Sequence, residues 1–251
     1  MPDFATACVL SYNRPQFIAE SLKTMIEGAD YPLEVIVHDD GSSDPIVRSY
    51  LRRLVDEGRI STVIENPPGH NQGQGTALNR MFNMAAGDPI IKLDQDLLFE
   101  QSWLRRCVQI LDANKERIEA LELEGQVAEE PLIGAMGLHR YHAEPVRYED
   151  MFIRDWGNGF LTWEQHEDFV GSSMVIPRDV WDAFGPFEEH SDAFAEDQGF
   201  KFLVKGEGLA LALPRDDQAS NQGFGVGPST VVVDHGTVAT IHKEPKLAVE
   251  R

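Results

Sequence analysis

ATACVLSYNRPQFIAESLKTMIEGADYPLEVIVHD, residues 5–39, decides the fold, because it holds two apolar runs on either side of a segment with helical periodicity. The runs cover residues 5–12 and 33–39 and are rich in aliphatic and β-branched residues, which is typical of buried strands. Between them, apolar residues recur at helical spacing: Ile18, Leu22, Met25 and Ile26. A strand, a helix and a second strand in this order predict a βαβ unit with two parallel strands.

The same alternation continues to residue 94. Residues 46–55 and 77–86 have helical periodicity, whereas residues 60–65 and 89–94 are short apolar runs typical of strands. Apolar strands that alternate with amphipathic helices indicate a parallel sheet with helices on both faces. The sequence therefore predicts an α/β fold with a mainly parallel, Rossmann-like sheet flanked by helices.

Beyond Asn114 the pattern is weaker. The strongly charged segment 115–130 is interpreted as either a solvated helix or an insertion. Further elements are expected along the rest of the chain: strands at 133–138, 169–176, 209–213 and 230–234, and helices near 178–184 and 196–205. Because no internal repeat and no Pro-rich or Ser-rich linker interrupts it, a single domain over residues 1–251 is expected.

The composition restricts the function. Of the 251 residues, 42% are hydrophobic and 25% are charged, which is typical of a folded domain rather than a disordered chain. The 42 acidic and 22 basic residues give a net charge of −20, so stable binding to nucleic acid is not expected. A nucleotide ligand remains compatible, because a metal ion and helix N-termini can hold a diphosphate inside an acidic protein.

The cysteines and the N-terminus indicate the compartment. Cys8 and Cys107 have no CxxC spacing and suggest no disulfide framework. The segment Met1-Pro2-Asp3 carries neither a basic region nor an apolar signal core, and no apolar run approaches the roughly 18 residues that span a bilayer. A cytoplasmic protein without a transmembrane segment is expected.

Polar residues follow three of the predicted strands. These segments are SYNR at 11–14, DDGSSD at 39–44 and DQD at 94–96. In open α/β sheets, ligands bind beyond the carboxyl ends of the strands, at a point where the strand order reverses. The three segments are therefore the first candidates for a binding site.

Two of these segments carry clustered carboxylates, which repel one another unless a cation or hydrogen-bond donors offset the charge. DDGSSD has two interpretations, a ligand site or a plain turn that ends in a helix N-cap, and both stay open. DQD follows an apolar strand and is the more specific signal. Its oxygen ligands suit Mg²⁺ or Mn²⁺, ions that bind through one or two carboxylates together with substrate phosphates.

Five longer motifs then occur in a recognisable order: VLSYNRPQFIAESLKTM, VHDDGSSD, NQGQGTALNRMFNMAAGDPIIKLDQD, GSSMVIPRDVWDAFGPFEE and EDQGFKFLVKGEG. With them the chain resembles a glycosyltransferase of family 2 with the GT-A fold, over roughly residues 5–210. The resemblance implies an inverting enzyme that uses a nucleotide-sugar donor. It also implies a nucleotide-binding half at about 1–99 and an acceptor-binding, catalytic half at about 100–251 of one GT-A domain.

The resemblance assigns roles to residues in the nucleotide-binding half. Leu10 and Tyr12 should border the base of the donor, Asp40 should contact the base, and Asp94 should lie near the ribose. The full set expected to bind the nucleotide sugar is Leu10, Tyr12, Arg14, Asp40, Asp94 and Gln95.

A metal is implied as well. Asp96 should bind Mn²⁺ or Mg²⁺, which bridges the diphosphate. His235 follows the apolar run 231–233 and Asp234, where similar enzymes often place a metal-ligating histidine. An ordinary surface or capping role for His235 is the equal alternative, and His242 is the second candidate ligand.

Asp197 matches the catalytic base of the family. The alternative is that Glu196 and Asp197 only complement the dipole of the helix they begin. Gly199 stands where many relatives carry another acidic residue, and the QxxRW-type motif of processive synthases is absent. These departures predict the addition of a single sugar rather than polymer synthesis.

Two other segments have open interpretations. The aromatic residues of 140–168 could form an acceptor platform or could pack a small core of their own: Tyr141, Tyr148, Phe152, Trp156, Phe160 and Trp163. The Gly-rich loop 215–229 is either a lid over the donor or a disordered excursion.

The function predicted from the sequence is therefore metal-dependent transfer of a sugar, with a UDP-sugar favoured, to a hydroxyl of a glycan, protein or small molecule. A sugar-phosphate nucleotidyltransferase is the alternative enzyme, although residues 11–15 are not its Gly-rich basic loop. A non-catalytic glycan-binding or nucleotide-binding module of the same fold is the third possibility. No GxGxxG follows the first strand and no GxxxxGK[ST] occurs, which disfavours a dehydrogenase and a P-loop enzyme.

Overall fold

The computed structural model describes residues 3–127, 131–138, 151–155, 160–165, 171–189, 196–216 and 232–234. In these residues the strands form a nine-stranded sheet with the order β3-β2-β1-β4-β9-β6-β10-β8-β7, and a small sheet of β5 and β11. The strands are β1 (Ala5–Ser11), β2 (Leu33–Asp39), β3 (Thr62–Glu65), β4 (Ile90–Leu93), β5 (Leu97–Phe99), β6 (Ile133–Gly137), β7 (Met151–Asp155), β8 (Phe160–Gln165), β9 (Ser173–Ile176), β10 (Ala210–Asp216) and β11 (Val232–Asp234). The helices are α1 (Pro15–Gly28), α2 (Pro45–Asp56), α3 (Gln74–Met84), α4 (Trp103–Leu123), α5 (Arg178–Phe184) and α6 (Glu196–Gly206).

The predicted α/β class and the mainly parallel sheet are confirmed. Strand β1 pairs in parallel with both β2 and β4, and β2 pairs in parallel with β3. Strand β9 is antiparallel to its neighbours β4 and β6, and β8 is antiparallel to β10 and β7. All other strands of the large sheet therefore run in the direction of β1.

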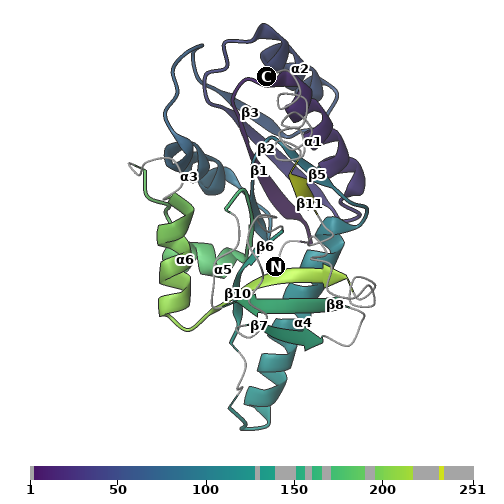
Figure 1. Cartoon of the computed structure of the whole chain (residues 1–251), viewed down its shortest axis with the longest axis vertical. Helices are drawn as coiled ribbons and strands as arrows, with labels where there is room; N and C mark the ends of the chain where they lie inside the picture. Colours follow the sequence, from purple (N-terminus) through teal and green to yellow (C-terminus); the bar gives the residue numbers. More distant parts are fainter. Residues whose placement is uncertain are drawn as a thin grey trace, which may run out of the picture.

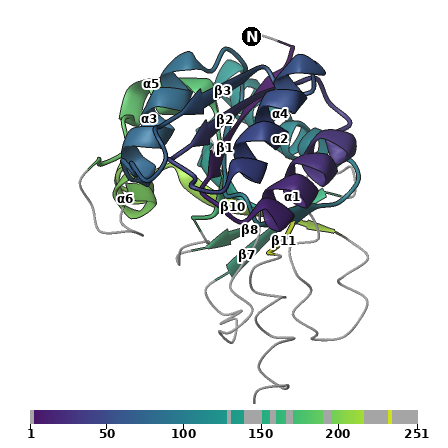
Figure 2. The same ribbon diagram turned by 90° about the horizontal axis from the view of Figure 1, so that it is seen from above.

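Helices cover both faces of the sheet, as the alternation of strands and helices predicts. Figure 2 shows α1, α2 and α4 on one side of β1–β3, and α3, α5 and α6 on the other. Each side has its own apolar core. Ile18, Leu51 and Trp103 belong to the first, whereas Phe82, Trp181 and Phe200 belong to the second.

The charged segment that begins at residue 115 is the second half of α4. Figure 1 shows this half of the helix extending past the large sheet. Asn114, which is buried, accepts a hydrogen bond from the backbone N–H of Ile133 (2.8 Å) and anchors the helix where it leaves the core. The interpretation as a solvated helix is therefore correct as far as Leu123, where the helix ends.

Some elements differ from the predictions. No strand was expected within 140–168 or at 97–99, yet β7 and β8 form an antiparallel hairpin at the edge of the sheet and β5 pairs with β11. The strands of an edge hairpin can expose one face to water, so they lack the continuous apolar pattern of a central strand. Strand β5 is apolar but only three residues long. Strand β10 continues to Asp216, so the predicted loop 215–229 begins later than expected. Within the described ranges, no helix has the length and apolar character that crossing a membrane requires.

Candidate active site

The strand order reverses between β1 and β4, because β2 and β3 lie on one side of β1 and β4 lies on the other. A cavity of about 260 Å³ opens at the carboxyl ends of these strands. It is lined by Leu10, Ser11, Tyr12, Arg14, Asp40, Asn71, Gln74, Asp94, Gln95 and Asp96. The fold therefore brings together every predicted nucleotide-sugar residue and Asp96 at the edge where open α/β sheets bind ligands.

Asn71 and Gln74 also line the cavity, and sequence reasoning did not single them out. They belong to the NQGQG segment that leads into α3. The signal was present, because this segment lies within a family motif and precedes a helix. The two residues were missed because amide side chains are common in such segments and carry no charge that a ligand would have to neutralise.

The turn after β1 is tied to the turn after β2. Asn13 and Arg14 both have left-handed backbone conformations, with φ of 54° and 55°. The Asn13 side-chain oxygen accepts hydrogen bonds from the backbone N–H groups of Ser43 (3.0 Å) and Asp44 (3.2 Å). Asparagine is among the few non-glycine residues that adopt this conformation readily. Its side-chain oxygen here takes the place of a backbone acceptor for the N–H groups of Ser43 and Asp44.

The DQD segment is fixed to the same turn. The Gln95 side chain accepts a hydrogen bond from the backbone N–H of Tyr12 (3.0 Å) and donates one to the Tyr12 carbonyl oxygen (2.9 Å). Arg14 Nη1 lies 3.2 Å from Asp96 Oδ2 and forms an ion pair. Tyr12 is 44% exposed and lines the cavity, so its side chain is accessible to a ligand. Gln95 thus orders the cavity wall through backbone contacts.

The three carboxylates of DDGSSD have different hydrogen-bond partners and positions. Asp39 is fully buried and accepts hydrogen bonds from the hydroxyl and the backbone N–H of Ser42. Asp44 is the N-cap of α2, and its side chain accepts from the backbone N–H of Ile46 (2.8 Å). The turn-and-cap interpretation therefore describes Asp39 and Asp44, whereas Asp40 lines the cavity.

Asp40 organises the loop that closes one side of the cavity. Its carboxylate accepts hydrogen bonds from Asn66 Nδ2 (2.7 Å) and from the backbone N–H groups of Gln72 (2.8 Å) and Gly73 (3.1 Å). Next to it, Gly41 has a φ of +86°, and a Cβ there would lie 2.7 Å from the carbonyl oxygen of His70. The loop therefore packs so closely on the turn that only glycine fits at position 41.

His38 lies on β2 directly before this turn and is fully buried. Neither ring nitrogen has a hydrogen-bond partner in the described residues. Burial lowers the pKa of His38, an effect that Asp40 opposes and Arg80 reinforces. The neutral imidazole is therefore the favoured form, and a packing role for His38 is consistent with this.

Asp94 and Asp96 supply oxygen ligands of the kind that a hard divalent cation prefers. The Arg14 guanidinium lies beside Asp96, so a positive charge already occupies the neighbourhood of that carboxylate. Within the described residues, no group of three or more His, Cys, Asp or Glu side chains is arranged to hold a metal. The two carboxylates fit a cation whose other ligands come from phosphates or from elsewhere in the chain. His235 and His242 lie outside the described residues.

Asp197 lies in the first turn of α6 and is buried. Its Oδ2 accepts a hydrogen bond from Lys201 Nζ (2.7 Å), one helical turn later. Its carboxylate packs on Gly171, and the carbonyl oxygen of the next residue, Ser172, accepts a hydrogen bond from the backbone N–H of Asp94 (2.9 Å). Asp197 therefore lies near the carboxyl end of β4, although it does not line the cavity itself.

The remaining predicted segments are only partly described. Phe152 lies on β7, and Phe160 and Trp163 lie on β8, so half of the aromatic set belongs to a hairpin. Tyr141, Tyr148 and Trp156 lie outside the described residues, as does the Gly-rich loop after Asp216.

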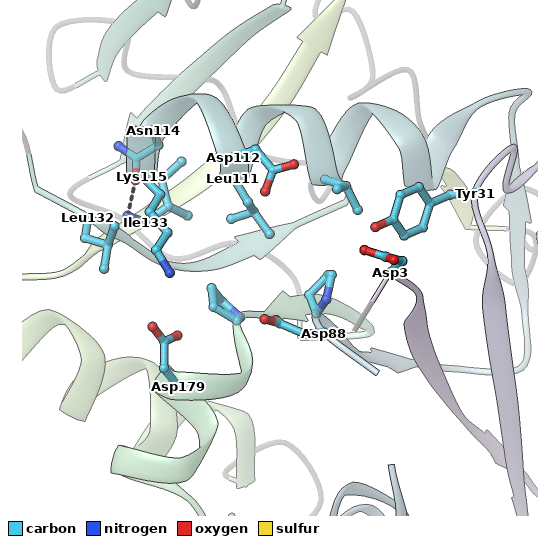
Figure 3. A pocket seen from close by; sticks show the side chains of 13 residues that line it. Asp3, Tyr31, Asp88, Leu111, Asp112, Asn114, Lys115, Leu132, Ile133 and Asp179 are labelled. Carbon is cyan, nitrogen blue, oxygen red and sulfur yellow. Dashed lines mark hydrogen bonds between the residues drawn. The ribbon is translucent and has the colours of Figure 1, made fainter. Parts of the chain in front are cut away.

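A second cavity, of about 180 Å³, lies at the opposite edge of the sheet (Figure 3). Figure 3 shows α4 along one side, with Asp112 and Lys115, and Tyr31, Asp3 and Asp88 from the segments that precede the strands. Its apolar residues include Val108, Leu111 and Ile133. The sequence pattern did not indicate this cavity, because its residues come from six separate segments.

Comparison with known proteins identifies relatives. Residues 6–162 match the family model described as Glycosyl transferase family 2. An uncharacterized glycosyltransferase of Haemophilus influenzae is 29% identical over 129 residues, which are 51% of this chain and 39% of that protein. The undecaprenyl-phosphate 4-deoxy-4-formamido-L-arabinose transferase of Edwardsiella ictaluri is 31% identical over 137 residues, 50% of this chain and 41% of that protein. The chain thus spans about two fifths of the length of these relatives.

A solved structure supports the fold. A mannosyltransferase from Pyrobaculum calidifontis, in complex with GDP-Man and Mn²⁺, aligns with a TM-score of 0.55 and 21% identity, covering 85% of this chain and 55% of that one. At this identity the similarity shows the fold alone. It agrees with the α/β architecture predicted from the sequence.

Proposed function

The chain belongs to glycosyl transferase family 2, and on that basis we propose that it transfers one sugar from a nucleotide-sugar donor to an acceptor hydroxyl with inversion of configuration. The observation that carries the proposal is the cavity at the strand-order reversal, whose wall contains Tyr12, Asp40, Asp94 and Asp96. The acceptor is proposed to be a glycan, a protein or a small molecule.

The donor binds with its base against Tyr12 and Leu10, near Asp40, and its ribose near Asp94. Three donors already satisfy the Asp40 carboxylate in part, and a carboxylate has about four acceptor positions. One further hydrogen bond from a base is therefore compatible with the contacts present. A UDP-sugar is favoured, and the base remains the first property to test.

Asp96 is the residue that would hold Mn²⁺ or Mg²⁺, with His235 as the further ligand proposed from the sequence and Asp94 beside it on the cavity wall. A cation bound there supplies charge neutralisation for the departing nucleoside diphosphate. Arg14 exchanges its ion pair with Asp96 for the donor phosphates, because its exposed side chain extends along the same cavity wall.

Asp197 removes the proton of the acceptor hydroxyl as that oxygen attacks the anomeric carbon. An alcohol is a weak nucleophile at neutral pH, so a positioned base contributes on the order of 10²–10⁴-fold to the rate. Attack on the face opposite the leaving diphosphate inverts the anomeric configuration. The burial of Asp197 near the end of β4 supports this role over a purely helix-capping one.

The decisive experiment is a panel of UDP-sugars and GDP-sugars with Mn²⁺ or Mg²⁺ and simple sugar acceptors. Release of nucleoside diphosphate, with NMR of the product showing inverted configuration, supports the proposal. Release of pyrophosphate from a nucleoside triphosphate and a sugar phosphate would instead identify a nucleotidyltransferase. Donor binding without any release would identify a binding module.

A further inference from the structure

The catalytic base proposed above forms a buried ion pair with a lysine of its own helix. Lys201 and Asp197 stand one turn apart on α6, their side chains are 2% and 6% exposed, and Nζ lies 2.7 Å from Oδ2. Exposed lysine–carboxylate pairs contribute little because water screens them, but a buried pair fixes both groups strongly.

Gly171 confines the same carboxylate from the other side. A Cβ built on Gly171 would lie only 1.5 Å from Asp197 Oδ2 and 2.3 Å from its Cγ. Any side chain at position 171 would therefore displace the carboxylate. The Asp197 group is held between the backbone of Gly171 and the ammonium of Lys201.

Lys92 connects this arrangement to the donor cavity. Its side chain is buried within β4, and its Nζ donates a hydrogen bond to the carbonyl oxygen of Gly171. The same strand ends at Leu93, and the backbone N–H of the next residue, Asp94, donates a hydrogen bond to the Ser172 carbonyl oxygen (2.9 Å). The segment that supports Asp197 is thus attached to the strand that leads into DQD.

We propose that Lys201 is a positioning residue, which holds Asp197 Oδ2 against Gly171 and so presents Oδ1 to the acceptor hydroxyl. The inference rests on the proposed function, because it assigns Lys201 a role through the catalytic base. A buried ion pair is seldom needed for stability, since apolar replacements of both partners are often tolerated. Its presence at the candidate base therefore points to placement of that base.

The test is a double-mutant cycle with Lys201→Met and Asp197→Asn, assayed with the nucleotide sugar that the wild-type protein turns over fastest. Misplacing a reacting group by about 1 Å can cost about 100-fold in rate. We expect Lys201→Met to lower kcat by about that factor with the donor Kd unchanged, and to cause no further loss in the Asp197→Asn background. Lys205→Met, on the exposed side of the same helix, is the matched control and retains wild-type kcat.

Wild-type kcat in Lys201→Met, or the same loss in both backgrounds, overturns the proposal. So does a donor Kd that weakens as much as kcat falls, because that result indicates a general structural role. Lys201→Gln is the second variant in case Lys201→Met does not fold. Its amide still donates a hydrogen bond but is one atom shorter than lysine, so kcat is expected to fall here as well, and full retention would contradict the proposal.

Failure of the proposed function gives a different result. If the wild-type protein releases nucleotide from no donor, the proposed function and the catalytic role of Lys201 both fail. The ion pair itself is still measured by the same cycle in thermal unfolding, which needs no donor. If the wild-type protein is active and the Lys201 variants keep its kcat, the proposed function stands and the inference about Lys201 fails.

Discussion

Two cavities, one at the carboxyl ends of the strands (the carboxyl edge) and one at their amino ends (the amino edge), contain clustered carboxylates. The groups that surround these carboxylates differ. At the carboxyl edge, Asp40 accepts three hydrogen bonds and Asp96 pairs with Arg14. At the amino edge, burial raises the pKa of Asp112, and Glu116 and Asp88 raise it further. In the first cavity hydrogen-bond donors and Arg14 offset the negative charge, whereas in the second Lys115 offsets the effect of burial and repulsion on Asp112 only in part.

The tyrosine of the amino-edge cavity shows the same effect. Burial raises the pKa of Tyr31, and the carboxylates of Asp112, Asp3 and Asp88 add to the rise. A cluster of acidic residues therefore does not by itself mark a site for a phosphate-bearing ligand. What distinguishes the carboxyl edge is the reversal of strand order, which sends the connecting helices to opposite faces and leaves a crevice between strand ends.

The largest expected effect compares two aspartates in the first turns of neighbouring helices. Asp197 lies in the first turn of α6 near the carboxyl edge, and Asp179 lies in the first turn of α5 at the amino-edge cavity. Asp197→Asn keeps the shape but removes the basicity, so kcat should fall by about 10²–10⁴-fold with donor binding retained. Asp179→Asn should leave kcat unchanged in the same steady-state assay. If Asp197→Asn and Asp179→Asn had the same kcat, the carboxyl edge of the sheet could not be distinguished from the amino edge as the site of catalysis.

A smaller effect is expected on donor affinity. Asp96→Ala, or EDTA added to the wild-type protein, should weaken donor binding by about 10-fold to 100-fold, the value of one lost charge-assisted interaction of about 1.5–3 kcal/mol. Calorimetric titration of the donor measures the change. Asp3→Ala removes a carboxylate from the amino-edge cavity and should leave the donor Kd unaltered. An EDTA-independent Kd would refute the metal assignment.

Asp40→Ala should affect stability and donor binding together. It leaves Asn66 and the N–H groups of Gln72 and Gly73 without their acceptor, at a cost of about 1–3 kcal/mol in the free energy of unfolding. Urea unfolding and donor titration measure the two effects. Asp44→Ala is the control within the same motif, because loss of the α2 N-cap costs about 1 kcal/mol without touching the cavity. A normal donor Kd in Asp40→Ala would limit Asp40 to a structural role.

His38 makes a pH-dependent contribution near the carboxyl edge. Because burial lowers its pKa from 6.5, the unfolded chain takes up a proton before the folded protein does. Its contribution is fully present above pH 6.5 and is lost as the pH falls through the lowered folded-state pKa. Unfolding free energies measured from about pH 7 to about pH 5 should therefore decline, and His38→Leu should flatten that decline. If the free energy of unfolding of His38→Leu declined with pH as steeply as that of the wild-type protein, His38 would not be the source of the decline.

The smallest effect belongs to Asp112, with the opposite sign. Its raised pKa means that the folded protein holds the proton more tightly, so stability is lost as the pH rises from 3.8 through the folded-state value. Asp112→Asn removes this loss and should raise the free energy of unfolding at neutral pH by about 0.5 kcal/mol or less, because the side chain is only partly buried and water screens its charge. Urea titrations at neutral and acidic pH should show the gain disappearing at the acidic end. A stability loss at neutral pH would show that the carboxylate is not strained there.

The sequence predicted the elements of the first half well, because each strand and helix there has an unambiguous period. Residues 5–12 and 33–39 are mainly apolar runs, and the turns after them carry residues with strong local preferences, such as Asn13 and Asp44. The hairpin of β7 and β8 was missed, since an edge strand needs neither a continuous apolar run nor strict alternation. Roles of individual site residues stay predictions, as do the metal, the donor and the division of the chain near residue 99.

What the sequence by itself determined is the family, the α/β class and the residues at the strand ends, because periodicity and short motifs are local properties of the chain. Only the tertiary structure decided which partners each carboxylate contacts. Asp39, Asp40 and Asp44 all belong to the DDGSSD segment, yet hydrogen bonds assign them to a turn, a loop and a helix cap. Likewise Gly171 packs against Asp197, and Lys92 donates a hydrogen bond to the Gly171 carbonyl oxygen, although these three residues come from segments far apart in the chain. Contacts across such distances depend on how strands are ordered and helices packed, and no local pattern encodes that order.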